Sequence, residues 1–104
     1  MLVQYTPRKG CERRLVALLE RHWPTLRAAG LASSSPARLW RARDKRDGRL
    51  HLLEMFEWRD EDASADAHDA PAVAAVWRPM EPLLDDMRIL RVEPLRVRLR
   101  GRPR

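Results

Sequence analysis

The sequence has little cysteine and no long apolar run. Cys11 is the single cysteine among 104 residues, so the chain cannot form an internal disulfide and a reducing compartment is expected. No apolar stretch approaches the roughly 18 to 20 residues that a membrane-spanning helix needs. The first residues also lack the charged and apolar regions of a secretory signal peptide. These absences predict a cytoplasmic protein that does not associate with membranes.

Lysine is also scarce, and the charge is unevenly placed. Lys9 and Lys45 are the only lysines among 21 basic residues, and the net charge is +6. From residue 91 onward six arginines face a single glutamate, so most of the net charge lies in a basic C-terminal tail over residues 95–104. A GC-rich coding sequence explains this arginine excess more simply than phosphate contacts do. We therefore expect no nucleic-acid partner, and the alternation over residues 95–100 predicts a peripheral edge strand.

Several catalytic and ligand-binding motifs are missing. The sequence has no glycine-rich phosphate loop and no serine, histidine and aspartate at the spacing of a hydrolase. The three histidines, His22, His51 and His68, fall on different predicted elements, and nothing in their spacing unites them. No second histidine or cysteine stands at ligand spacing from His68. The sequence therefore predicts no metal site.

The β-prone runs that are present are short and separated by turn signals. They predict strands over residues 2–6, 37–43, 50–58 and 87–94. Helical patterns lie between the first two strands and before the last one, which gives the order β-α-β-β-α-β. This order predicts a ferredoxin-like α+β sandwich with a four-stranded antiparallel sheet in residues 1–94.

The helical segments carry recognisable start and stop signals. Apolar residues at steps of three and four predict a helix over residues 11–30 that is kinked at Pro24 and stopped by Gly30. After the third strand, Asp60 is predicted to cap a short helix. Asp69 is predicted to cap the next helix, which has Pro71 in its first turn and further prolines that end it irregularly.

The strand over residues 50–58 is apolar on both of its faces. Leu52 and Phe56 lie on one face, and Leu53 and Met55 lie on the other. One layer of helices can cover only one face of a small antiparallel sheet. We therefore predict that a second copy of the chain covers the other face, as a homodimer.

The segment EMFEWRDEDASADAHDAPAVAAVW, residues 54–77, resembles the antibiotic biosynthesis monooxygenase-like family of the dimeric α+β barrel superfamily. Members combine a strand that ends in Glu-Trp, an acidic helix start, a histidine and a second amphipathic helix. Glu57, Trp58 and His68 occupy those places, and the order of elements agrees over residues 2–94. The resemblance implies a homodimer whose two four-stranded sheets form a barrel, with a pocket between each sheet and its helices.

The resemblance also bears on the cofactor. Some members oxidise electron-rich aromatic molecules or quinol precursors with dioxygen and no bound cofactor, whereas others degrade heme. The heme-degrading members use a histidine of the second long helix as iron ligand and an upstream tryptophan against the porphyrin. These positions fall on Trp77 and Ala67 here, and an indole does not ligate iron as an imidazole does. We predict that the chain retains no heme, flavin or metal.

His68 is the candidate catalytic residue. Histidine is the side chain whose ordinary pKa, roughly 6.5, suits a base near neutral pH. The alternative is a structural role in which His68 hydrogen-bonds the loop between two helices. Four aromatic residues are candidates for the wall of a ligand pocket, although each alone is also typical of a core: Tyr5, Trp40, Trp58 and Trp77. If the indole N–H of Trp58 is buried, it needs an acceptor such as Glu57, His68 or a nearby carbonyl.

Glu54 is an acidic residue within an apolar face. It stands between Leu52 and Phe56, where a charge needs a partner. Arg41, on the neighbouring predicted strand, is one candidate partner, and we favour a structural ion pair over a pocket role for Glu54.

Two functions remain open at this point. The first is a cofactor-independent monooxygenase for a small aromatic or quinol-like molecule, in which His68 takes the hydroxyl proton and the resulting anion reduces dioxygen. The second is a non-catalytic protein of the same fold that binds a small hydrophobic molecule or has a regulatory role. The sequence does not separate them, because one fold hosts both kinds of protein.

Overall fold

The computed structural model describes residues 1–101, so the end of the predicted basic tail, residues 102–104, lies outside the described residues. The elements follow the predicted order, and the ferredoxin-like fold is confirmed. They are β1 (Leu2–Pro7), α1 (Glu12–Ala28), β2 (Arg38–Arg43), β3 (Leu50–Met55), α2 (Ala63–His68), α3 (Pro71–Met80), the 3₁₀ turn η1 (Glu81–Leu83) and β4 (Leu84–Leu90). Within residues 1–101, none of the helices is long and apolar enough to cross a membrane.

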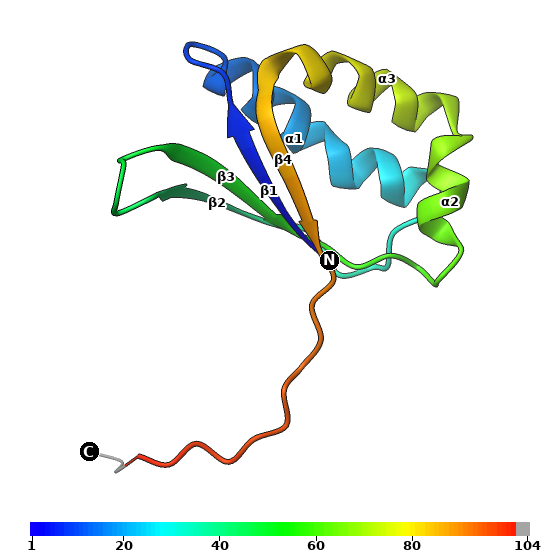
Figure 1. Cartoon of the computed structure of the whole chain (residues 1–104). Coiled ribbons are helices and arrows are strands. Elements are labelled where there is room, and N and C mark those ends of the chain that lie inside the picture. Colours follow the sequence, from blue (N-terminus) through cyan, green and yellow to red (C-terminus); the bar gives the residue numbers. More distant parts are fainter. Residues whose placement is uncertain (102–104) are drawn as a thin grey trace.

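The four strands form one antiparallel sheet in the order β2-β3-β1-β4. The first strand of the sequence is therefore central, with β3 on one side and β4 on the other. Helices α1 and α3 lie next to each other on one face of the sheet, and the opposite face is left uncovered (Figure 1). The core lies between the sheet and these helices and includes Val3, Tyr5, Leu52, Phe56, Leu15, Leu19, Leu26, Val73, Val76 and Met80.

Strand β3 supplies apolar side chains to both faces of the sheet, as predicted. Leu52 is buried on the helix-covered side, whereas Leu53 and Met55 are half-buried on the other side. Trp40 of β2 stands opposite Leu53 in the strand register and is 40% exposed. Tryptophan and aliphatic side chains thus share the face that no helix covers.

The helix boundaries follow local chemistry. Gly30 adopts a φ of +74°, a left-handed conformation that favours glycine, and it ends α1 as predicted. Pro71 stands in the first turn of α3, and the chain passes through η1 after Met80, which confirms the irregular end. The predicted cap by Asp69 is wrong. Asp69 closes α2 instead, because only two residues separate the helices and its N–H bonds to the carbonyl of Asp66.

Residues 91–101 have no regular secondary structure, so the single chain lacks the strand predicted over residues 95–100. The chain leads away from the sheet beyond β4 (Figure 1). Leu95 and Leu99 are 82% and 86% exposed. A strand obtains its backbone hydrogen bonds from a neighbouring strand, and this segment has none beside it.

Candidate functional site

A cleft of about 530 Å³ opens between the sheet and the helices, next to β4. The central strand β1 forms its floor, and side chains from all three helices reach into it. Its lining is mainly apolar and aromatic, and includes Val3, Phe56, Met80, Met87 and Ile89. Pockets of this size and character hold small organic ligands, and the volume suits an aromatic molecule of two or three rings.

Four of the five predicted site residues lie on this cleft. Tyr5 comes from β1, Trp58 from the segment after β3, His68 from the end of α2 and Trp77 from α3. Residues far apart in the sequence therefore meet at one place. Their roles toward a ligand remain predictions.

Trp40, the fifth predicted residue, does not line the cleft. It stands opposite Leu53 in the register of β2 and β3 and shares the uncovered face of the sheet. There the guanidinium of Arg38 lies 5.1 Å from the centre of its ring. The prediction of a pocket role within this chain is wrong, because the alternation of the strand turns Trp40 away from the helices.

His68 lies at the open side of the cleft. Its imidazole is exposed to solvent and meets the Trp77 ring edge to face, with 5.1 Å between the ring centres. Among residues 1–101, none forms a hydrogen bond with this imidazole. The side chain is thus positioned by aromatic contact and has both ring nitrogens available.

Trp58 forms part of the aromatic wall. It packs edge to face against Phe56, with 4.9 Å between the ring centres. Its indole N–H is buried and has no hydrogen-bond partner in the described part of the chain, so the predicted partners Glu57 and His68 are wrong.

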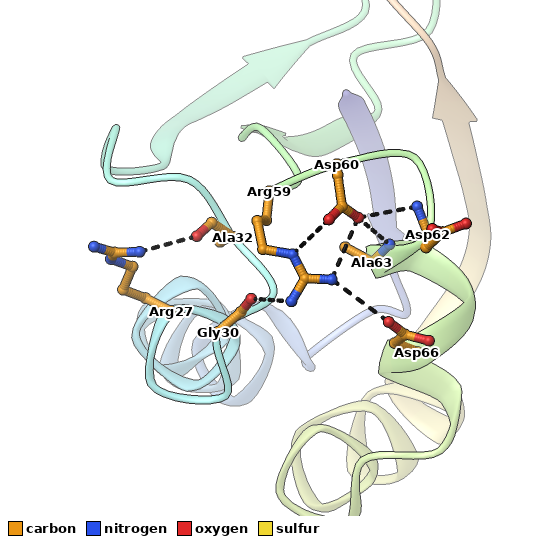
Figure 2. A network of polar contacts seen from close by, with 8 residues as sticks. All are labelled: Arg27, Gly30, Ala32, Arg59, Asp60, Asp62, Ala63 and Asp66. Carbon is orange, nitrogen blue, oxygen red and sulfur yellow. Dashed lines mark hydrogen bonds and ion pairs between the residues drawn. The ribbon is translucent and has the colours of Figure 1, made fainter.

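The loop that leads into α2 is organised by Arg59. Its guanidinium donates to the carbonyl oxygen of Gly30 at 2.7 Å and to the carboxylate of Asp60 at 2.7 Å, and it lies 3.5 Å from Asp66 (Figure 2). The Asp60 carboxylate accepts the backbone N–H groups of Asp62 and Ala63, so it holds the turn that leads into α2, whose N-cap residue is Asp62 and not Asp60 as predicted. The hydrogen bond from Arg59 holds the pKa of the Asp60 carboxyl below its usual range. These contacts fix α2, and with it His68, relative to the end of α1.

A chain of buried polar groups lies behind the cleft. Glu54 is completely buried, and its carboxylate accepts the Tyr5 hydroxyl at 2.7 Å and the His22 Nδ1 hydrogen at 2.9 Å. Arg41 was the candidate partner predicted for an ion pair, but it pairs with Glu12 near the surface. That prediction is wrong because the side chain of Glu54 points into the core beneath α1, where His22 is its neighbour.

The hydrogen bonds of His22 determine where its proton lies. An indole N–H can only donate, and the N–H of Trp77 lies 2.8 Å from Nε2 of His22. Nε2 must therefore be an acceptor, so the ring proton is on Nδ1 and is donated to Glu54. Burial raises the pKa of the Tyr5 phenol far above its usual value, and the charge of Glu54 and the hydrogen bond to it act in the same direction. The chain thus consists of a neutral imidazole and a neutral phenol around one carboxylate.

The three histidines lie in two different places in the fold. The fold brings both His22 and His68 into contact with Trp77 on the same cleft, which their spacing did not indicate. His51 lies on the uncovered face and pairs with the hydroxyl of Thr6 at 2.8 Å. Within residues 1–101, no three histidine, cysteine or acidic side chains gather as a metal site would require.

The fold has relatives among solved structures. It is similar to Rv0793 from Mycobacterium tuberculosis, with a TM-score of 0.67, 21% identity and coverage of 92% of this chain and 93% of that one. It is also similar to a protein described as an antibiotic biosynthesis monooxygenase, with a TM-score of 0.63, 14% identity and coverage of 89% and 96%. A third relative is SnoaB, a cofactor-independent oxygenase from Streptomyces nogalater, with a TM-score of 0.61, 16% identity and coverage of 88% and 91%.

The chain has the fold of the antibiotic biosynthesis monooxygenases. The resemblance found in the sequence is thereby confirmed at the level of the fold, and the monooxygenase fold extends over nearly the whole chain. No protein-family model and no curated protein sequence matches the chain.

Proposed function

We propose that the chain is a cofactor-independent monooxygenase that oxidises a small aromatic molecule with a hydroxyl group, such as a phenol or quinol. The observation that carries this proposal is the cleft, an apolar space of about 530 Å³ with Trp58 and Trp77 in its wall and His68 at its open side. The fold adds support, because SnoaB, which shares it, is described as a cofactor-independent oxygenase.

The proposed reaction needs a base and a dry pocket. We assign the base to His68, which removes the hydroxyl proton of the substrate and leaves an electron-rich anion that reduces dioxygen. For a phenol with a free para position, one oxygen atom becomes the second carbonyl of a quinone. The other oxygen leaves as water with the hydroxyl and ring hydrogens, so no reductant is consumed. The apolar wall excludes bulk water. Electrostatic interactions between the anion and polar groups of the protein are stronger in such a dry pocket than in water.

The test is dioxygen uptake by the purified protein with 1-naphthol, in the presence of a metal chelator. We expect equal amounts of dioxygen consumed and quinone formed. If 1-naphthol binds in the cleft but is not oxidised, the result favours a non-catalytic binding protein, which is the alternative function.

We also infer a homodimer that buries the uncovered face of the sheet. Apolar side chains gather there, and they include Leu2, Trp40, Leu53, Met55 and Leu90. An exposed apolar face of this kind commonly marks a protein interface. A second copy supplies a matching face by symmetry, since a two-fold interface joins the same patch of both subunits.

A further inference from the structure

His22 presents a hydrogen-bond acceptor, its Nε2 atom, in the inner wall of the cleft. Nε2 of His22 is an acceptor, because it receives the indole N–H of Trp77, and Nδ1–H is held by both oxygens of Glu54 at 2.9 Å. The carboxylate is held in turn by the hydroxyl of Tyr5. A partner of this kind behind an imidazole fixes both its tautomer and its orientation.

His22, which carries this acceptor, lines the cleft. Of the side chains that line the cleft, Tyr5 and His22 are the buried ones with polar atoms, at 2% and 3% exposure. The Tyr5 hydroxyl hydrogen is committed to Glu54. The other side chains of the lining that carry polar atoms are half-buried or exposed, and among them the indoles of Trp58 and Trp77 can only donate. A ligand that enters deeply therefore meets Nε2 of His22 as the acceptor on an otherwise apolar wall.

Access to Nε2 is controlled by Trp77. Its indole N–H occupies the lone pair of Nε2 at 2.8 Å, and its ring also forms part of the cleft wall. Trp77 is half-buried and belongs to α3, so a rotation of its side chain would break no pairing between strands. When it does, Nε2 loses a donor and needs another, because a buried acceptor without a partner is costly.

We propose that Nε2 of His22 is the site that recognises a hydroxyl group of the ligand, and that the indole N–H of Trp77 holds this site closed until the ligand replaces it. The inference rests on the proposed ligand site in the cleft but concerns binding and not catalysis, because a hydroxyl hydrogen that Nε2 of His22 holds is not available to His68. In a ligand with two hydroxyl groups, His22 binds one of them and His68 removes the hydrogen of the other. One donor replaces another at the same nitrogen, so a hydroxyl ligand restores the hydrogen bond that it breaks. A ligand without a donor either leaves Trp77 in place or leaves Nε2 unpaired. The site therefore accepts phenolic molecules without a net loss of hydrogen bonds, whereas their ethers keep Nε2 paired only while Trp77 stays in place.

The experiment compares 1-naphthol with 1-methoxynaphthalene, which differ in the one hydrogen that the site should recognise. Their dissociation constants are measured by calorimetry without dioxygen, so that turnover plays no part. The Trp77→Phe variant keeps an aromatic ring but loses the competing N–H. We expect the preference for naphthol over the ether to rise about fivefold in this variant, the effect of one net hydrogen bond. Both ligands lose the same contact area when phenylalanine replaces the indole. The effect of this loss on the two dissociation constants therefore cancels in their ratio.

Trp58 provides the matched control. It also lines the cleft, but its N–H has no acceptor within residues 1–101, so Trp58→Phe should leave the ratio unchanged. Nitrogen-15 spectra of the histidine side chains give a second measurement, and should show a protonated Nδ1 and an unprotonated Nε2 for His22. An unchanged or lower ratio in Trp77→Phe, a protonated Nε2, or no binding of 1-naphthol to Trp77→Phe would each overturn the proposal. None of these results depends on whether the wild-type protein consumes dioxygen.

Discussion

The hydroxyl of Tyr5 and the carboxylate of Glu54 meet at 2.7 Å inside the core, although 49 positions separate the two residues in the sequence. The bond ties β1 to β3 on the side of the sheet that faces the helices, and His22 extends it to α1. A completely buried carboxylate is stable only when donors of this kind surround it. The three side chains therefore behave as one unit, and removal of one affects the others.

Replacement of Glu54 by leucine should lower the free energy of unfolding by about 3 kcal/mol, because the Tyr5 hydroxyl and His22 Nδ1–H would lose their buried acceptor. Urea denaturation measures this change. The triple variant Tyr5→Phe, His22→Leu and Glu54→Leu should recover part of the loss, since it removes the orphaned donors as well. A triple variant less stable than Glu54→Leu would show that the three residues contribute independently.

Tyr5 is the only tyrosine of the chain, so its ionisation can be followed by the ultraviolet absorption of phenolate. Burial raises its pKa above the ordinary value of 10.0. A raised pKa means that the fold favours the neutral phenol. This stabilisation is fully present below pH 10 and is lost as the pH rises above it. We expect no phenolate signal above about pH 10 until the protein unfolds, whereas the denatured chain should titrate near 10. An ordinary titration with unchanged circular dichroism would contradict the buried hydrogen bond.

His68→Ala should leave the melting temperature almost unchanged, because the imidazole is exposed and its aromatic contact is with the ring of Trp77. If His68 is the base, the same variant should lower the rate of dioxygen uptake by a factor of about 10² to 10⁴. Both quantities are measured on one preparation, together with binding of 1-naphthol. A normal rate with normal binding would remove His68 from the mechanism.

Trp40→Arg should convert the proposed homodimer into a monomer, since it introduces a charge into the uncovered face of the sheet. Leu39→Arg is the matched control. Leu39 is the neighbour of Trp40 on β2 and is similarly exposed, at 43% against 40%, but it points to the other face. Light scattering should show a dimer for the wild type and for Leu39→Arg, with an interface on the order of 2,000 Å² in total. A monomeric wild type would refute the proposed dimer.

The sequence predicted the order of elements because each one carries its own local signal. Gly30 stops a helix by its own backbone freedom, and Asp60 holds the turn before α2 through N–H groups within three residues of it. The face to which Trp40 points was not predictable in the same way. Its strand has apolar residues at two adjacent positions, so the register with β3 decides which of them faces the helices.

The buried centre of the site was missed for a related reason. Glu54 and His22 are each polar residues at a position of an apolar face, and that signal was visible in the sequence. What joins them is the crossing of α1 over β3, which brings together residues 32 positions apart. Local patterns do not fix such a crossing, and a nearby arginine then looks like a better partner than a distant histidine.

Arg59 links the end of α1 to the start of α2 through Gly30 and Asp66 (Figure 2). If α2 moves outward to widen the cleft, this exposed guanidinium has to release one of its partners. Ion pairs between exposed groups weaken as the salt concentration rises. If ligand entry requires this movement, its rate should depend on ionic strength even when the ligand itself carries no charge.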